Sequence, residues 1–223
     1  MAQSDDDYLD LPDPNQRSFT VDDNTSASNP GRTRMQPWVW IAHYPKWPFL
    51  LGGGLIGTAA GGWYLHWSLW ILAVLFAAAN FFYWMRVKEH FRSGCINASV
   101  VIGMNPMRIA VSTDLSTGVG SYPVVKIIEK KLSMVVGGQP QVGTRLATVA
   151  LYEAAVDDEG NVVDGDHWKD FDPVPVECAT SDVAAQQRAL ESISEEEFRE
   201  LDAALAKLPD PPATGLHRLW EDA

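Results

Sequence analysis

The longest apolar stretch of the chain runs from Lys46 to Arg86, and it contains no Asp, Glu, Lys or Arg between these two cations. It is long enough for two helices of 19 residues each, 47–65 and 67–85. A helix of about 20 apolar residues crosses a hydrocarbon core about 30 Å thick. Because only His66 separates the two segments, we predict a transmembrane hairpin of two short helices with a tight turn.

Aromatic residues gather at both ends of this hairpin, where amphipathic rings favour the membrane interface. Segment 35–46, which precedes the hairpin, is predicted to be an interfacial aromatic segment interrupted by prolines. The turn carries no cation, whereas the outer ends carry Lys46 and Arg86, followed by Lys88 and Arg92. By the positive-inside rule, we expect a multi-pass protein of the bacterial inner (cytoplasmic) membrane with both termini in the cytoplasm.

Small residues recur at intervals of four in both predicted helices. Gly53, Gly57 and Gly61 form a glycine zipper in the first helix, and Ala73 and Ala77 repeat the spacing in the second. Such residues let two helices approach closely in lipid. We predict that these five residues are helix-packing residues. Two alternatives stay open, because the groove could pack within the hairpin or between two copies of the chain.

The pattern changes after the hairpin, where segment 93–220 is predicted to form a cytosolic β-rich domain. Runs of β-branched residues, separated by Gly and Pro turns, predict short strands. The last run contains prolines, which place it at a sheet edge. The predicted strands are 96–103, 107–113, 122–132, 144–154 and 173–179.

Two helices are predicted at the C-terminal end of this domain. Asp182 is placed to cap 183–191, and Ser194 with Glu197 forms a capping box for the second helix. The fold class is therefore α+β, with a two-helix transmembrane hairpin followed by a small, partly open barrel-like domain. Segment 215–220 is expected to return and pack on the domain.

The N-terminal segment 1–34 has few apolar residues, seven acids and three bases, so we expect an acidic disordered tail without a cleavable signal peptide. Segment 93–223 carries 21 acids and 10 bases, and the whole chain has a net charge of −12. Nonspecific nucleic-acid binding needs a basic surface, so this class of partner is excluded.

We expect no catalytic, cofactor-binding or metal-binding residues. GGGLIG at 52–57 matches GxGxxG, but it lies inside an uncharged span and lacks the strand and the acidic residue of a dinucleotide site. The acidic loop 157–172 does not have EF-hand spacing. Cys95 and Cys178 form no CxxC motif, and the five histidines form no HExxH motif.

These patterns favour a non-catalytic membrane protein whose cytosolic domain is an interaction or assembly module. Its expected partners are the lipid bilayer and either an unidentified protein or a second copy of the chain, and no small-molecule substrate is inferred. One alternative is a membrane-tethered hydrolase or thiol enzyme with its site near Cys178 and the acidic loop. The other is a small membrane oligomer assembled through the glycine groove.

The pieces GMNPMRIAVSTDLSTG, GTRLATVALY, WKDFDPVPVECAT and GLHRL, within residues 95–220, resemble an uncharacterised bacterial membrane-protein family defined by a domain of unknown function. The architecture also resembles that of NfeD-like membrane proteins by analogy. That resemblance implies a soluble part built as an oligonucleotide/oligosaccharide-binding-type barrel, and it implies no catalytic residues.

Overall fold

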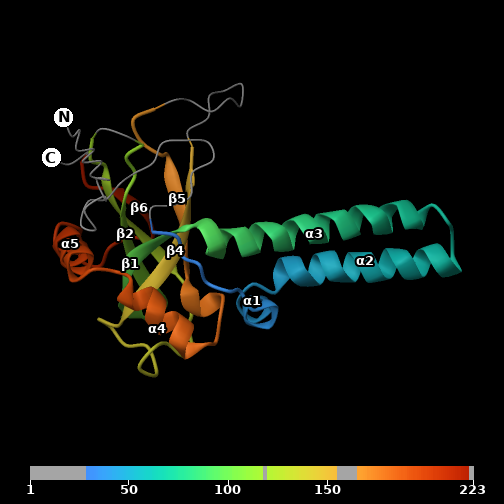
Figure 1. Ribbon diagram of the computed structural model, residues 1–223, viewed down its shortest axis with the longest axis horizontal. Helices are drawn as coiled ribbons and strands as arrows, with labels where there is room; N and C mark the ends of the chain where they lie inside the picture. Colours follow the sequence, from blue (N-terminus) through green and yellow to red (C-terminus); the bar gives the residue numbers. More distant parts are fainter. Residues whose placement is uncertain (1–28, 118–119, 155–164, 221–223) are drawn as a thin grey trace, which may run out of the picture.

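The computed structural model describes residues 29–117, 120–154 and 165–220, and it consists of a helical hairpin that projects from a sheet-based domain (Figure 1). Residues 1–28 of the predicted disordered tail lie outside the described residues. The same is true of residues 157–164 of the acidic loop.

The hairpin consists of α2 (Lys46–Tyr64) and α3 (Leu69–Ser93), and the short helix α1 (Pro37–His43) precedes it. Only α3 is long and apolar enough to cross a membrane by length and composition, among the helices that the structure describes. The glycines and aromatic residues of α2 lower its mean hydropathy. The structure thus shows a helical hairpin with one candidate membrane helix, and α3 continues eight residues past the predicted end at residue 85 because its last turns pack on the domain.

Six antiparallel strands form one sheet in the order β5-β4-β1-β2-β3-β6, and the sheet curls into a half-barrel. β5 lies at one edge, as its prolines predict. β6 closes the other edge by pairing with β3, so the segment expected only to pack on the domain forms a strand. The strands are β1 (Cys95–Met104), β2 (Met107–Asp114), β3 (Pro123–Glu129), β4 (Arg145–Glu153), β5 (Asp170–Pro175) and β6 (Gly215–Arg218).

Helices α4 (Val183–Glu191) and α5 (Glu195–Leu205) follow the sheet, after a single turn of 3₁₀-helix, η1 (Val176–Cys178). Segment 173–179 is therefore only partly a strand, because β5 ends at Pro175 and η1 covers Val176–Cys178. The predicted caps are confirmed. The Asp182 carboxylate accepts the backbone N–H groups of Ala184 and Ala185, and Ser194 Oγ accepts that of Glu197.

The core of the domain includes residues from both sides of the hairpin. Phe91 of α3 is fully buried in it, and Met35 and Trp40 enter it from the N-terminal side. We call residues 29–36 the arm. The arm donates hydrogen bonds from Gly31 N–H to the Gly94 carbonyl (2.9 Å) and from Thr33 N–H to the Phe91 carbonyl (3.0 Å).

The arm corrects one boundary predicted from the sequence. We expected disorder to extend to residue 34, whereas residues 29–34 have a defined backbone that pairs with the end of α3 and the start of β1. Backbone hydrogen bonds hold this segment in place, and the types of its side chains therefore gave no sign in the sequence that it is ordered. A Cβ at Gly31 would lie 2.8 Å from a methyl carbon of Val149, so the backbone there approaches β4 too closely for any other residue.

Candidate functional site

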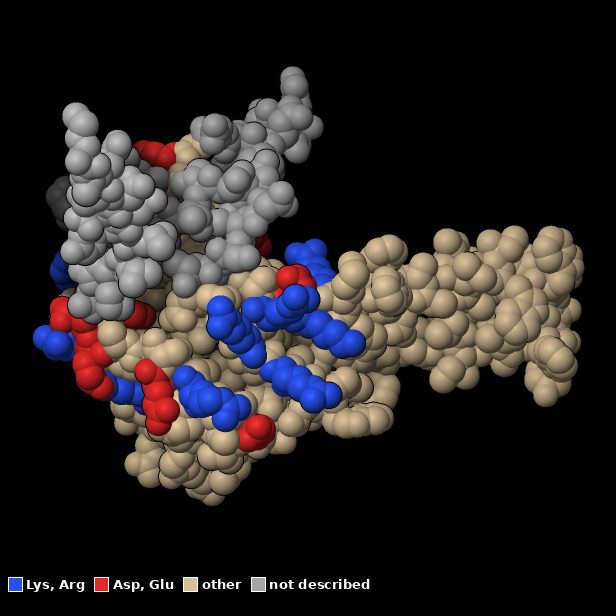
Figure 2. Space-filling view, in the orientation of Figure 1, with Lys and Arg blue, Asp and Glu red and all other residues tan. Residues whose placement is uncertain are grey.

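The surface of the hairpin is apolar along its whole length. Large side chains that would normally be buried point outward on both helices, including Ile56 (73% exposed) on α2 and Val74 (66% exposed) on α3. In the space-filling view, no Lys, Arg, Asp or Glu interrupts the hairpin surface (Figure 2). Monomeric soluble proteins rarely expose a continuous apolar surface of this extent, which marks a site of interaction.

Two glycines at the contact between α2 and α3 each lie one residue after a predicted packing glycine. A Cβ at Gly54 would lie 2.7 Å from Phe76 Cζ, and one at Gly62 would lie 2.9 Å from the Trp70 ring. Gly61 also faces α3, because a Cβ there would lie 2.7 Å from Leu69 Cδ1. These glycines allow the bulky side chains of α3 to pack against the α2 backbone.

Of the other predicted packing residues, only one is buried in the chain. Ala73 is 4% exposed, whereas Ala77 is exposed. A Cβ at Gly53 or at Gly57 would meet no atom within 4 Å. These two glycines therefore do not serve the hairpin contact, and they leave an open groove on the outer face of α2.

An aromatic cluster joins the base of the hairpin to the domain. Trp40 stacks on Tyr44 with ring centroids 4.2 Å apart, and its indole N–H donates to the Tyr83 hydroxyl at 2.7 Å. The Lys130 ammonium lies 3.3 Å from the Tyr44 ring centroid, and it donates to the His43 carbonyl at 3.0 Å. Burial lowers the pKa of Lys130 and raises that of Tyr44.

This cluster divides the predicted interfacial aromatic segment into two groups. Trp40 is 9% exposed and belongs to the domain core, where it also meets Phe91 edge-to-face. Trp38, two residues earlier, is 82% exposed. Trp40 therefore holds the segment in place by its contacts with the domain, and Trp38 is free to contact another surface.

Cations surround the hairpin where it leaves the domain, and we call this set the basic collar. All of its members are exposed, and none forms an ion pair with a carboxylate in the described part of the chain. Lys and Arg side chains gather on this face of the molecule (Figure 2). An anionic surface would be attracted here. The collar comprises Arg32, Arg34, Lys46, Arg86, Lys88, Arg92 and Arg188.

One of the two cysteines, Cys178, is shielded from solvent. Cys178 of η1 is fully buried, and burial raises the pKa of its thiol to about 12, so the reactive thiolate is absent at neutral pH. Glu177, beside it, is also buried, and burial raises the pKa of its carboxyl to about 7. Its Oε2 atom has no hydrogen-bond partner among the described residues.

His167, the histidine considered for catalysis, belongs to a separate exposed cluster. Its Nδ1 lies 2.7 Å from Asp166 Oδ1, and its ring stacks on Tyr122 at a centroid distance of 4.5 Å. The Tyr122 hydroxyl donates to Asp166, and this hydrogen bond raises the pKa of Tyr122 and lowers that of Asp166. Trp220 meets both rings edge-to-face. The cluster fixes the edge of the sheet near β6.

Sequence reasoning missed this cluster, because no local spacing connects a tyrosine, a carboxylate and a C-terminal tryptophan. The described residues contain no group of three His, Cys, Asp or Glu side chains that could hold a metal ion. The chemically distinctive region is therefore the base of the hairpin, where an apolar projection, exposed aromatic rings and unpaired cations meet.

Comparison with known proteins gives one family and one solved structure. The model of the family described as "Protein of unknown function (DUF3239)" matches residues 84–209. A solved structure described as "Crystal structure of a putative membrane protein from Corynebacterium diphtheriae" is similar with a TM-score of 0.44 and 21% sequence identity. The similarity covers 56% of this chain and 99% of that chain. No curated protein matches the chain.

Proposed function

The chain belongs to the family described as "Protein of unknown function (DUF3239)", and from this premise we propose that it is a non-catalytic protein of the bacterial inner membrane. In this proposal, the hairpin α2–α3 is inserted in the bilayer. The domain and both termini lie in the cytoplasm, where the domain serves as an interaction or assembly module.

The outward-facing apolar surface of the hairpin carries this proposal. Phe49, Leu75 and Phe82 are each at least 60% exposed, and the chain has no charged residue between Lys46 and Arg86. In water these side chains would lose the free energy gained by burial, about 25 cal/mol per Å² of apolar surface. In a hydrocarbon core they would be solvated, and each helix would satisfy its own backbone hydrogen bonds.

The packing of α2 on α3 supports insertion of both helices. α3 passes the test of length and apolarity by itself, and α2 lies against it over the contacts of Gly54, Gly61 and Gly62. Because these contacts run from the middle of α2 to its C-terminal end, a bilayer that surrounds α3 would also surround α2 there. The basic collar at the base and the uncharged turn at the tip support a cytoplasmic domain.

Membrane extraction and cysteine labelling test this proposal. We would replace Cys95 by Ala and introduce Ser68→Cys at the tip or Ser133→Cys in the domain, both at partly or fully exposed positions. The protein should remain in the membrane pellet at alkaline pH. A membrane-impermeant maleimide should label the tip variant in spheroplasts and the domain variant only after lysis. Recovery of the protein in the soluble fraction, or the reverse labelling, would contradict the proposal.

The buried state of Cys178 argues for a non-catalytic domain over a thiol enzyme. Its thiol stays protonated at neutral pH, and His167 contacts Asp166, Tyr122 and Trp220. Turnover of a thiol-enzyme substrate by the full-length protein that disappears in a Cys178→Ala variant would overturn this argument. With no such turnover, capture of a protein partner by the full-length chain would define the module.

The open groove at Gly53 and Gly57 favours a second candidate, in which copies of the chain assemble in the membrane. A Cβ at either position would meet nothing in the chain, so the groove is available to another helix at close approach. Gly57→Leu should then abolish oligomers in detergent while the hairpin stays intact.

Gly54→Leu is the matched variant, because its side chain would collide with Phe76 inside the hairpin. It should disturb the hairpin whether or not copies associate. Chemical cross-linking and light scattering in detergent would measure both variants. Oligomers that persist in Gly57→Leu would remove the groove from any assembly role.

A further inference from the structure

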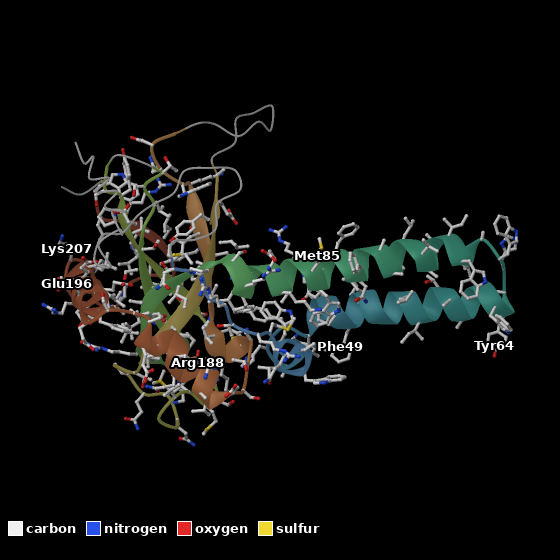
Figure 3. All side chains as sticks on the ribbon, in the orientation of Figure 1. Phe49, Tyr64, Met85, Arg188, Glu196 and Lys207 are labelled. Atoms are coloured by element: carbon white, nitrogen blue, oxygen red, sulfur yellow. The ribbon has the colours of Figure 1, made fainter. Side chains whose placement is uncertain are left out.

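A cavity of about 1060 Å³ lies between the arm and α4, on the side of the domain from which the hairpin emerges. Its lining includes three arginines from two elements, Arg32 and Arg34 of the arm and Arg188 of α4. Segments 29–38 and 180–192 thus meet around one concave surface, although about 150 residues separate them in the chain. Figure 3 labels Arg188 on α4.

The cavity carries an excess of positive charge among the residues that the structure describes. None of its three arginines forms an ion pair with a described carboxylate. Asp182 is the only acidic residue among the described lining residues, and its Oδ1 is already used to accept the N–H groups of Ala184 and Ala185. An arginine fork binds phosphate through paired, charge-assisted hydrogen bonds, so this lining suits a phosphate group.

The backbone of the arm has an unusual conformation at the wall of this cavity. Arg32 has a φ of 42°, which is the left-handed region that residues other than glycine rarely adopt. The arm is fixed in this conformation on both sides, because Arg32 N–H donates to the Arg92 carbonyl (3.3 Å) and Gln36 N–H donates to the Ala179 carbonyl (2.7 Å). The strained residue is therefore held, with its neighbour Arg34, at the wall of the cavity.

The position of the cavity identifies the source of the phosphate. Trp38 is part of the lining, is 82% exposed and lies in α1, eight residues before α2 begins at Lys46. Its three arginines belong to the basic collar, and the backbone contact between Arg32 and Arg92 joins the cavity to the collar residues of α3. If the hairpin is inserted, headgroups of the cytoplasmic leaflet are the phosphates nearest to this wall, and exposed tryptophans favour that layer.

We propose that this arginine-lined cavity binds the phosphate of an anionic lipid headgroup at the cytoplasmic face of the membrane. The proposal rests on the proposed function, because a lipid reaches the cavity only when the hairpin is in the bilayer. It adds a defined headgroup site to the general attraction of the collar. Lipid selectivity would then depend on three named arginines.

The test uses the full-length protein in neutral detergent micelles that contain either phosphatidylglycerol or phosphatidylcholine, with lipid binding counted by native mass spectrometry. We expect phosphatidylglycerol to bind about tenfold more tightly than phosphatidylcholine. The double variant Arg34→Gln/Arg188→Gln should lose most of this preference. Arg199→Gln is the matched control, because Arg199 is an exposed arginine of α5 outside the cavity.

Competition with soluble phosphate distinguishes a lipid phosphate from a free anion as the ligand of the cavity. Inorganic phosphate at millimolar concentration should not displace the lipid, and displacement would make this a soluble-anion site and overturn the lipid assignment. Equal binding of the two lipids, or an unchanged preference in the double variant, would also overturn it. A second double variant, Arg34→Lys/Arg188→Lys, keeps the charge and should retain part of the lipid preference. It replaces the double Gln variant if that protein folds poorly.

Flotation with pure phosphatidylcholine vesicles reports on the hairpin alone. Insertion of the double variant into these vesicles together with loss of lipid preference in micelles is the expected result. Failure of the wild-type protein to insert would instead contradict the proposed membrane anchorage, while the micelle measurement would still show whether the cavity distinguishes the two lipids.

Discussion

Large apolar side chains are exposed on the hairpin, whereas in the domain most of them are buried. In the domain, Ile109, Val125 and Phe171 are fully buried, and the labelled side chains that project from it in Figure 3 are Arg188, Glu196 and Lys207. In the hairpin, the labelled side chains that project are Phe49, Tyr64 and Met85 (Figure 3). The two regions share one chain, but each has the surface that suits a different solvent.

The boundary between these two regions is narrow and lies within α3. Ala73 is buried, whereas Val74, Leu75, Phe81 and Phe82 are exposed. Val87 and Phe91 turn into the domain core. One continuous helix therefore passes from an exposed apolar surface to a packed protein interior. The change occurs where the cations of the collar begin, at Arg86.

The largest effect is expected when an apolar ring is removed from the domain. Phe171→Ala should destabilise the domain by about 3–5 kcal/mol, because Phe171 is fully buried and the change leaves a cavity. Phe82→Ala, at a position 60% exposed, is the matched control and should change domain stability by less than about 0.5 kcal/mol. Thermal unfolding of the full-length protein in detergent measures both. Similar losses would show that the two regions do not differ.

A charge introduced into the hairpin should impair membrane insertion, whereas a charge at an exposed position of the domain should not. Val74→Lys should make membrane insertion less favourable by about 3 kcal/mol, because Val74 lies near the middle of the predicted span. Val142→Lys, at an equally exposed position of the domain (63%), should have no such effect. Insertion in a reporter fusion compares the two variants. Normal insertion of the Val74 variant would place this face of α3 outside lipid.

Burial of Glu177 in the domain favours the neutral form of its carboxyl. Because burial raises its pKa from 4.5 to about 7, the folded state holds the proton to higher pH than the unfolded state. The stability from this group is fully present below about pH 4.5, and it is lost as the pH rises through 7. The loss is at most about 3 kcal/mol.

Glu177→Gln should remove this pH dependence and leave the variant more stable than the wild-type protein at pH 8. Unfolding of both proteins in detergent at pH 5 and at pH 8 measures the difference. Equal pH dependence in the two proteins would show that Glu177 is solvated. Glu191→Gln, at an exposed position of α4, provides the control.

The smallest effect concerns the wet surface of the domain. Arg145 Nη1 donates to both carboxylate oxygens of Glu195 (2.8 and 2.9 Å), and the guanidinium lies over the Phe198 ring at 4.4 Å. Because both side chains are exposed, Glu195→Gln should cost less than about 1 kcal/mol, and salt should reduce the difference. Unfolding at low and high ionic strength checks this. A loss above 2 kcal/mol would mean that this surface is shielded from water.

The sequence predicted the elements of both regions well, because their signals are local. The absence of charge between Lys46 and Arg86 indicated the hairpin, and the Asp182 and Ser194 caps located the starts of α4 and α5. The short strand β6 could not be predicted as a strand, since its four residues show no pattern before they pair with β3.

The helix-packing residues were only partly predicted, for a geometric reason. Gly53, Gly57 and Gly61 form one row spaced by four, and Gly54, Thr58 and Gly62 form a second row beside it. Spacing alone does not decide which row faces α3. The choice depends on the bulky Phe76 and Trp70, which pack onto Gly54 and Gly62.

The arginine-lined cavity could not be predicted from the sequence. Its walls come from the arm and from α4, and the arm is held by backbone hydrogen bonds that any residue type can make. The cluster of Tyr122, Asp166 and His167 has the same origin, because the fold alone brings it together.

The arm has a consequence for the order in which the protein is made. Met35 and Trp40 are synthesised before the hairpin, yet their partners in the core, such as Phe91, come after it. The hairpin is thus an insertion within the folding unit, and the domain cannot close until the ribosome has passed both helices. In a protein of this design the hairpin is complete before the globular part exists.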